Sequence, residues 1–471
     1  MYKASELISF WSHLKPTEIA FADESHEVNF RELDMYTRKI GFLLKETGIK
    51  RGEVVGLILP GYLAWLFSLT LSRMGISAVM QNNLDPFSPE LIPDWVVTLE
   101  PHSDKDAAHT IIVNEEFLSN MNASKELESF EGFASPTDIA TFYSTSGTNG
   151  ESKFRANSAE YIWKAALRVH PSTAFGEDDA FILLPFGSAW TNIHAAMCLI
   201  LGKTYYNCHF TDERLQKFVT KYPIRTLMGS PVQISTFFNF QKKYGTKLPL
   251  LKTVIMGGSA PSVHLAQRIK SQLDCQIVNA YGSTEAGFAA FSIMGDGQPE
   301  GAWINPAVEL QIVDDKDNVL PAMSVGHLRY RRSDMETFYY NNLADTLQYF
   351  KDGYFYPGDL GFIDNEGRLV LEGRNTDVIN LGGVKVNPDR IEVIALSQVG
   401  IRDCATFGHI NDSGVEELCI AIVIDSEFNR ENFEQAMRAK IPYSIAHLNV
   451  VPAIPRNQTG KIQRNLLVKE S

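Results

Sequence analysis

The chain has 471 residues and is poor in cysteine and in basic charge. Its five cysteines are odd in number and none are spaced as C-x-x-C, which excludes a disulfide scaffold and argues against a zinc ribbon. Lys and Arg total 43 against 56 Asp and Glu, giving a net charge of −13. This balance argues against nucleic acid or an anionic membrane as the main partner. It leaves room for a small phosphate ligand, which backbone amides can hold locally.

The chain also lacks an uninterrupted apolar run of membrane-spanning length. The uncharged stretch Val54–Ser72 is broken by Pro60 and Gly61. It therefore predicts a buried strand followed by a buried helix, because a span needs about 20 continuous apolar residues. The N-terminus shows no long apolar stretch before a small-residue cleavage site, so we expect no signal peptide and a cytosolic location.

Length and hydrophobic pattern predict more than one domain, since single cores stop growing at about 250–300 residues. Up to about residue 302, amphipathic segments such as 30–47 alternate with apolar segments such as 54–59. This alternation predicts an α/β fold with mostly parallel sheets covered by helices. Residues 302–373 have the pattern of antiparallel hairpins, and the remaining residues return to a small α+β pattern.

The segment TSGTNGESK at 145–153 follows the apolar stretch IATFYS and predicts a loop that leaves a strand. Its glycines permit a tight turn and close approach of the backbone to a ligand. Successive N–H groups and hydroxyls can surround a polyphosphate, and Lys153 can add positive charge. The alternative is a solvated turn, which composition alone favours.

The segment NAYGSTEAG at 279–287 stands at the end of a predicted strand, where open α/β sheets bind ligands. The ring of Tyr281 can cover a base. Glu285 offers the hard oxygen ligand that Mg²⁺ takes together with substrate phosphates. The alternative is a capping turn in which Ser283 or Thr284 begins a helix, and the residues alone do not decide between the two.

Two further loops carry weak signals of their own. In YPGD, Asp359 can accept hydrogen bonds from both hydroxyls of a ribose, and Gly373 and Arg374 follow fourteen residues later; the alternative is a plain hairpin turn. Near the C-terminus, Lys461 lies in the glycine-containing segment PRNQTGKIQR, and the alternative is an exposed lysine.

In order and spacing, these four motifs resemble the acyl-adenylating superfamily of acyl-CoA synthetases, peptide-synthetase adenylation domains and beetle luciferases. The resemblance covers nearly the whole chain and includes NLGGVKVNP at 380–388. It implies a large N-terminal core (1–373) with a small barrel-like β subdomain (about 302–373), and a mobile α+β C-terminal domain (374–471). It also implies ATP-dependent activation of a carboxylic acid to an acyl-adenylate with release of pyrophosphate, and Mg²⁺ as the metal. The acyl group then passes to the phosphopantetheine thiol of CoA or of a carrier protein.

The resemblance assigns roles residue by residue. It assigns contacts with the ATP phosphates to the loop residues Thr145, Ser146, Gly147, Thr148, Gly150 and Lys153. It assigns the nucleoside site and its surroundings to Tyr281, Gly282, Ser283, Asp359 and Arg374. Thr284 matches the residue that touches the α-phosphate, Glu285 the Mg²⁺ ligand, and Lys461 the lysine that bridges the acid and the α-phosphate. It assigns the pantetheine tunnel to Gly382, Gly383 and Lys385, and it assigns the hinge to Thr376 and Asp377.

By position, the acid pocket involves Trp190, Asn192, Met228, Gly229, Met256, Gly257, Gly258 and Gly282. The segment 187–192 contains no Asp to hold an α-ammonium group, which argues against an amino acid. Trp and Met side chains favour a flat or short apolar acid, so we expect an aryl or small acyl acid. Trp190 is either a pocket wall or gate, or ordinary core. Ser188 stands where relatives often carry a gating histidine.

Departures from the family pattern keep other functions open. Asn149 and Ser152 replace the usual Thr and Pro of the phosphate loop, and Thr376 replaces the usual charged hinge residue. The alternatives are a luciferase-type oxidoreductase that acts on its own adenylate, and a non-catalytic adenylate-binding protein. The presence of Lys461, Glu285 and Asp359 favours catalysis.

Overall fold

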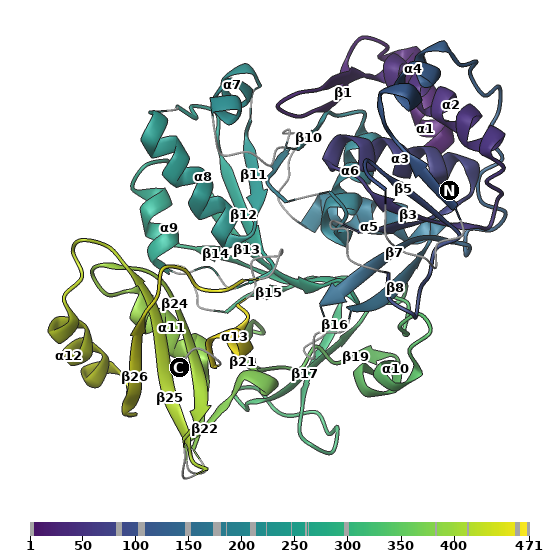
Figure 1. Cartoon of the computed structure of the whole chain (residues 1–471). Helices are drawn as coiled ribbons and strands as arrows, with labels where there is room; N and C mark the ends of the chain where they lie inside the picture. The colour runs from purple at the N-terminus through teal and green to yellow at the C-terminus, as the bar shows by residue number, and fades with distance from the viewer. Residues whose placement is uncertain are drawn as a thin grey trace.

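The parts of the chain that the computed structural model describes are residues 4–81, 87–101, 109–146, 152–172, 180–184, 186–207, 213–222, 224–245, 247–259, 261, 263–295, 301–381, 384–411, 414–456 and 462–468. Figure 1 shows their arrangement, with two helix-covered sheets, a β-rich part below them and a C-terminal part beside it. Several predicted site residues lie outside the described residues: Gly147, Thr148, Asn149, Gly150, Gly382, Gly383 and Lys461.

The first sheet has the order β6-β5-β3-β4-β7-β8 and is parallel except for the final antiparallel pair. Its strands are β3 (Val54–Ile58), β4 (Ser77–Met80), β5 (Trp95–Thr98), β6 (His109–Ile112), β7 (Ile139–Ser146) and β8 (Ser152–Ser158). The helices near it are α1 (Ala4–Leu14), α2 (Phe30–Thr47), α3 (Gly61–Met74) and α4 (Glu115–Ala123). Helix α2 begins at a capping box between Asn29 and Glu32 and ends at Gly48 with φ 96°, as a C-terminal glycine should.

The second sheet has nine strands in the order β15-β14-β13-β12-β11-β9-β10-β1-β2. They are β1 (Ile19–Ala22), β2 (Glu27–Asn29), β9 (Ala180–Ile182), β10 (Tyr205–Asn207), β11 (Thr226–Gly229), β12 (Thr253–Gly257), β13 (Gln276–Ser283), β14 (Gly287–Met294) and β15 (Trp303–Ile304). Pairing is parallel from β1 to β13, and antiparallel where β2, β14 and β15 join.

Helices cover both faces of the second sheet. They are α5 (Ala159–Ser172), α6 (Ala189–Leu201), α7 (Glu213–Lys221), α8 (Pro231–Tyr244) and α9 (Val263–Lys270). One core cluster joins α3, α5 and α6 to residues of both sheets, and another packs α7, α8 and α9 on the far face of the second sheet. Helices α3, α5 and α6 are therefore enclosed between the two sheets, and the predicted α/β fold is confirmed.

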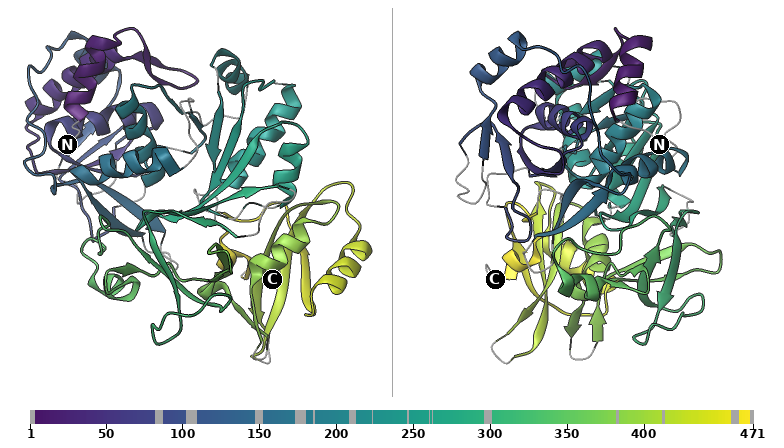
Figure 2. Two further views of the ribbon diagram at one scale, coloured as in Figure 1. Left: turned by 180° about the vertical axis from the view of Figure 1, so that it is seen from behind. Right: turned by 90° about the vertical axis from the view of Figure 1, so that its right-hand side faces the viewer.

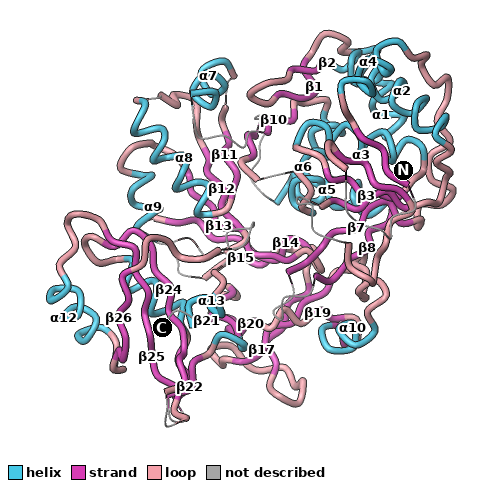
Figure 3. Tube along the Cα trace, in the orientation of Figure 1, coloured by secondary structure: helices cyan, strands magenta, loops and turns pink. Residues whose placement is uncertain are grey.

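The β-rich part is a six-stranded antiparallel sheet, seen in magenta in Figure 3. Its elements are β16 (Glu309–Val313), β17 (Gly326–Arg331), α10 (Leu343–Tyr349), β18 (Phe350–Lys351), β19 (Tyr354–Phe355), β20 (Asp359–Ile363) and β21 (Leu369–Arg374). The sequence pattern of 308–320 favours two strands around an Asp/Asn turn. The second of these is reduced to a single bridge between Val313 and Val319, and the chain enters another turn after Pro321.

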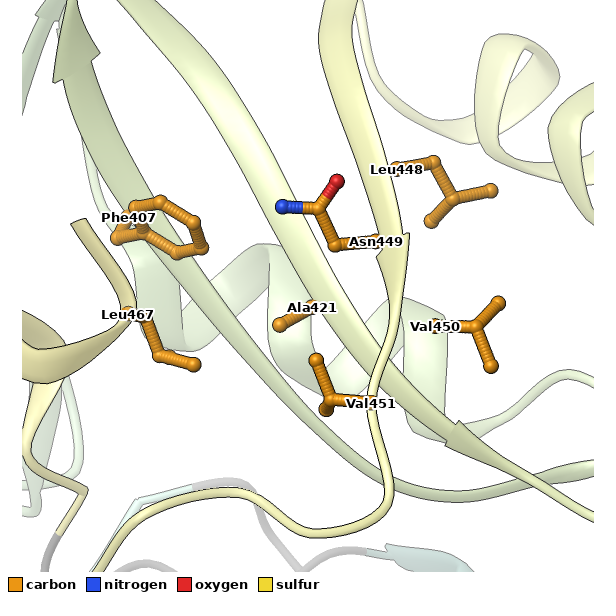
Figure 4. Close-up of a pocket in the computed structure, with 7 residues that line it drawn as sticks. All are labelled: Phe407, Ala421, Leu448, Asn449, Val450, Val451 and Leu467. Atoms are coloured by element: carbon orange, nitrogen blue, oxygen red, sulfur yellow. The ribbon is translucent and has the colours of Figure 1, made fainter. Parts of the chain in front are cut away.

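The residues after Arg374 build their own hydrophobic clusters around a three-stranded sheet β24-β25-β26. The elements are η1 (Asn375–Asp377), β22 (Ile379–Leu381), β23 (Val384–Val386), α11 (Pro388–Leu396), β24 (Ile401–Ile410), β25 (Glu416–Ile424), α12 (Arg430–Lys440), β26 (Ile445–Val450) and α13 (Arg464–Val468). A hollow of about 500 Å³ opens between α13 and this sheet, with Phe407, Asn449 and Leu467 among its lining residues (Figure 4). A domain boundary at Gly373–Arg374 stays a prediction.

The stretch Val54–Ser72 is divided between β3 and α3, as its interrupted pattern predicts. Among the described helices, we find none with the length and continuous hydrophobicity that crossing a bilayer requires.

Candidate active site

The phosphate-loop motif begins in β7 and ends in β8. Thr145 pairs with Lys153, and Ser146 with Ser152, on either side of residues 147–151, which are outside the described part. Side chains alternate along a strand, so Phe154 enters a hydrophobic cluster while Lys153 points to the other face. There the Lys153 side chain is buried. Its Nζ lies 2.9 Å from Asp345 Oδ1 and 3.9 Å from the centre of the Tyr349 ring.

The motif at 279–287 forms the reversal between β13 and β14. Thr284, Glu285 and Ala286 make the turn, and a strand follows it, so the alternative of a helix start at Ser283 or Thr284 is wrong. A side chain at Gly282 is excluded, because its Cβ would lie 2.5 Å from the carbonyl oxygen of Gly287. The turn thus holds Tyr281 and Glu285 at the end of β13, beside the edge where the parallel strands end.

Glu285 is a buried carboxylate, 8% exposed. Its Oε1 accepts a hydrogen bond of 2.8 Å from the Tyr339 hydroxyl. Burial and the neighbouring Glu285 charge raise the pKa of Tyr339, which keeps this phenol a donor. Within the described residues, no basic side chain forms an ion pair with Glu285. A buried carboxylate without a counter-cation is costly, and its oxygens are of the type that Mg²⁺ prefers. The residue therefore fits a magnesium ion.

Tyr281, Asp359 and Arg374 come together from three strands. The Tyr281 hydroxyl donates a hydrogen bond to Asp359 Oδ2, and Arg374 Nε lies 3.3 Å from Asp359 Oδ1. Asp359 begins β20 and pairs directly with Arg374 in β21, so it is a strand residue rather than part of a plain hairpin turn. Burial and the Asp359 charge raise the pKa of Tyr281 well above its usual value. The group combines an aromatic ring, a hydrogen-bond acceptor and a cation, which are kinds of group that can contact a nucleoside.

Trp190 lies in the first turn of α6 and faces the end of β12. A Cβ placed on Gly257 would lie 3.0 Å from Cη2 and Cζ3 of the Trp190 ring, so this glycine makes room for the indole. Ser188 is the N-cap of α6, with its Oγ accepting the Thr191 N–H at 3.2 Å, which gives it a structural role at the position of the expected gate. Asn192 Nδ2 donates to the Ser188 carbonyl oxygen at 3.1 Å.

Two predicted pocket residues, Met256 and Gly229, face away from Trp190. Met228 belongs to the core cluster that includes α5 and α6, whereas Met256 belongs to the cluster on the α8 side of the sheet. A Cβ on Gly229 would approach Leu183 and Gln233, again on the α8 side. Met256 and Gly229 are adjacent in register, so they share a face, and alternation along the strands puts Met228 and Gly257 on the opposite one.

Arg464 connects the predicted hinge to the end of the motif that contains Lys461. Its Nη1 lies 2.9 Å from Asp377 Oδ2, and its Nη2 lies 2.8 Å from Asp389 Oδ1 and 2.7 Å from Glu392 Oε1. Burial raises the pKa of Glu392 to about 7, against the opposing effect of Arg464. The sequence motifs assign no role to Arg464 or to Glu392; the available signal was that two oppositely charged residues lie in or near separate motifs.

Tyr339, Asp345 and Tyr349 were missed by sequence reasoning altogether. They lie on and beside α10, in a segment without any glycine-rich or charged motif. The Tyr339 ring also lies 5.4 Å from Lys153 Nζ, so Tyr339 contacts both the lysine of the first motif and the glutamate of the second. The side chains of Thr376 and Lys385 lie outside the described part.

The chain is similar to known proteins over most of its length. The model of a family described as AMP-binding enzyme matches residues 10–340. The chain is 24% identical to a 2-succinylbenzoate–CoA ligase of Listeria monocytogenes, over 96% of this chain and 97% of that protein. It is 25% identical to a 4-chlorobenzoate–CoA ligase of an Arthrobacter species, over 99% of this chain and 95% of that protein.

Solved structures show the same fold. The anthranilate CoA ligase AuaEII in complex with anthranoyl-AMP superimposes with a TM-score of 0.87 at 19% identity, covering 100% of this chain and 97% of that one. The o-succinylbenzoate CoA synthetase of Bacillus subtilis in complex with ATP and magnesium gives 0.83 at 19% identity, covering 98% of each chain.

Proposed function

This chain belongs to the family of AMP-binding enzymes, and on that premise we propose that it activates a carboxylic acid with ATP. The acid becomes an acyl-adenylate with release of pyrophosphate, and the acyl group then passes to the thiol of coenzyme A. The proposed substrate is an aryl or small acyl acid, and the proposed metal is Mg²⁺.

The observation that carries this proposal is the convergence of three distant segments at one edge of the second sheet. Tyr281, Asp359 and Arg374 form a group suited to a nucleoside. Glu285 and Lys153 each contact Tyr339. A base and ribose site next to a carboxylate and a lysine is the set of contacts that a nucleoside triphosphate with a divalent cation needs.

In the first half-reaction, a carboxylate oxygen attacks the α-phosphorus, the bond from that phosphorus to the bridging oxygen breaks, and pyrophosphate leaves. Negative charge grows on the phosphorus oxygens, and positive groups fixed nearby stabilise it. We assign this role to Lys461, with Thr284 beside the α-phosphate. We assign Lys153 and the loop residues Thr145 and Ser146 to the outer phosphates. Magnesium bound at Glu285 would neutralise phosphate charge.

In the second half-reaction, the thiol sulfur attacks the acyl carbon, AMP leaves, and the thiol proton is released. We assign the approach of the pantetheine arm to Gly382, Gly383 and Lys385. The domain of residues 374–471 is proposed to turn at Thr376 and Asp377 between the two steps, as hinged domains do.

The substrate class is supported by the pocket. The contact between Trp190 and Gly257 offers a flat apolar wall, and the segment 187–192 holds no acidic side chain for an α-ammonium group. Two similar proteins are named for aryl acids and for CoA, which supports both parts of the proposal. A phosphopantetheinyl carrier protein is the competing acceptor.

ATP–pyrophosphate exchange tests the first step. The panel is benzoate, 4-chlorobenzoate, 2-succinylbenzoate and anthranilate, set against acetate, malonate, palmitate and phenylalanine. We expect exchange with an aryl acid and none with phenylalanine. Exchange confined to palmitate or to phenylalanine would contradict the substrate class, and no exchange with any acid would contradict the reaction.

Thioester formation from CoA, and from a holo carrier protein at equal concentration, then decides the acceptor. Lys461→Ala should lower exchange about 100- to 1000-fold, the size of a lost oxyanion donor, while leaving AMP binding in place. Lys440→Ala, on the exposed end of α12, is the matched control and should exchange at the wild-type rate.

A further inference from the structure

The ammonium group of Lys153 has a carboxylate partner within the chain. The group lies 2.9 Å from Asp345 Oδ1, with the Tyr349 ring centre at 3.9 Å and the Tyr339 ring centre at 5.4 Å. The Lys153 side chain is 11% exposed and that of Asp345 is 24% exposed. The pair is thus largely shielded from solvent, and a short ion pair in such surroundings is stronger than one on the surface.

Asp345 is itself fixed in place. It lies in the first turn of α10, where its N–H donates to Asn342 Oδ1 at 2.9 Å and its Oδ2 accepts from Asn342 Nδ2 at 2.9 Å. Asn342 Nδ2 also donates to Glu90 Oε1 at 2.8 Å, which ties α10 to the segment before β5. The carboxylate therefore cannot follow Lys153 if the lysine turns to another anion.

A triphosphate that binds beside Lys153 brings negative charge to the lysine that Asp345 already neutralises. The negative charges of the phosphates and of the Asp345 carboxylate repel each other, and both anions can pair with the Lys153 ammonium group. The tyrosine rings attract the cation whichever anion it contacts, so they hold Lys153 in this region during an exchange of partners.

We infer that Asp345 is a positioning residue that competes with the outer phosphates of ATP for Lys153 and so sets the affinity for ATP and pyrophosphate. The inference rests on the proposed role of Lys153 in phosphate binding. Asp345 is the internal counter-ion that the phosphates must displace. It holds the lysine ammonium in its buried position, and it weakens retention of pyrophosphate after adenylation.

The test is Asp345→Asn, with dissociation constants measured by titration calorimetry in Mg²⁺ for ATP, pyrophosphate and AMP. The amide keeps the shape of the side chain and an oxygen that can accept from Asn342. We expect ATP and pyrophosphate to bind about three- to tenfold more tightly, because the pair is shielded from solvent but not fully buried, and a tenfold change is about 1.4 kcal/mol. AMP, which lacks the outer phosphates, should bind unchanged. A merely structural role for Asp345 would weaken all three ligands together.

A double-mutant cycle with Lys153→Met isolates the competition. The gain from Asp345→Asn should shrink when Lys153 is absent, because only direct repulsion of the phosphates is then relieved. Glu434→Gln, which removes a carboxylate from an exposed ion pair on α12, is the control and should change no dissociation constant.

The outcomes separate the inference from the function on which it rests. Unchanged or weaker ATP binding by Asp345→Asn, in a protein whose wild type binds ATP through Lys153, overturns the inference alone. A wild type that binds neither ATP nor AMP overturns the proposed function as well.

Discussion

Replacing Arg464 with methionine removes one cation from three carboxylates. The guanidinium contacts Asp377, Asp389 and Glu392, and its Nε also donates to the Thr406 carbonyl oxygen at 2.9 Å. Methionine keeps much of the apolar length of the side chain, so the substitution isolates the charge and its hydrogen bonds. The affected elements are η1, α11, β24 and α13.

The magnitude follows from how deeply each carboxylate is buried. Asp389 is 44% exposed, and such a pair contributes at most about 1 kcal/mol. Glu392 is 8% exposed, and removing the partner of a buried charge costs about 3–5 kcal/mol. The exposure of the Asp377 side chain lies between those of Asp389 and Glu392, and the Thr406 N–H still donates a hydrogen bond to Glu392. We therefore expect the substitution to lower the stability of the C-terminal part by about 2–4 kcal/mol at pH 8.

The loss should depend on pH with a definite sign. Burial already raises the pKa of Glu392 to about 7 while Arg464 opposes that rise. Without Arg464 the pKa rises further, and the carboxyl becomes neutral instead of staying charged and unpaired. At pH 6 the wild-type Glu392 is largely protonated, so less is lost, and we expect about half the cost that is found at pH 8.

Amide hydrogen exchange of β24 and β25 measures this loss directly, since protection reports the free energy of local opening. All six tryptophans lie between residues 11 and 303, so tryptophan fluorescence reports only on the N-terminal part and serves as an internal reference. We expect the fluorescence midpoint in urea to stay unchanged while the C-terminal amides lose protection.

Arg430→Met is the matched control, because Arg430 pairs with Glu434 on the exposed side of α12 and its loss should cost under about 0.5 kcal/mol. Equal protection of β24 and β25 in Arg464→Met and wild type at pH 8 would refute the reasoning. A cost that is larger at pH 6 than at pH 8 would refute the assignment of the effect to Glu392.

Three further predictions concern the site and the same network. Tyr339→Phe removes the donor to Glu285, so the Mg²⁺ concentration for half-maximal pyrophosphate exchange should shift about three- to tenfold, with AMP affinity unchanged; an identical Mg²⁺ profile would contradict it. Gly257→Ala places a Cβ 3.0 Å from the Trp190 ring, so KM for the acid should rise while the dissociation constant of ATP stays constant, as steady-state kinetics and calorimetry will show. Because the pKa of Glu392 is raised, stability that is present below pH 4.5 is lost as the pH rises through about 7. Glu392→Gln should remove this pH-dependent loss, which amounts to at most about 3 kcal/mol in the opening free energy measured by hydrogen exchange. The same dependence on pH in Glu392→Gln and in the wild type would count against the prediction.

Local pattern predicts the elements of this fold where one residue spacing dominates. The 30–47 segment becomes α2 without any change of bounds, because its apolar spacing, its Asn29 cap and Gly48 all agree. The strand expected after the Asp/Asn turn does not form: residues 314–318 are all charged or polar, and only Val319 and Leu320 precede Pro321, which has no N–H for a strand ladder.

It was harder to predict from the sequence which face of the sheet each strand residue of the site occupies. Met228 and Met256 both occupy the ends of neighbouring parallel strands, and position along the chain gives them equal access to a pocket. The register pairs Met228 with Ile255, so Met256 points to the other side of the sheet. A one-residue difference in register reverses the face, and no local motif carries that information.

The sequence motifs contain the groups that we propose for nucleotide binding, but not the residues that connect those groups. Lys153 belongs to the first sheet and Glu285 to the second, so neither hairpin alone fixes their separation. The segment around α10 does so: Tyr339 contacts both residues, and Asp345 holds the lysine. The N–H of Tyr339 in turn donates to Thr346 Oγ1 at 2.9 Å, which fixes the tyrosine to α10. Substitutions in this segment should therefore alter the response to the outer phosphates and to Mg²⁺ while sparing AMP, whose proposed contacts run through Tyr281 and Asp359.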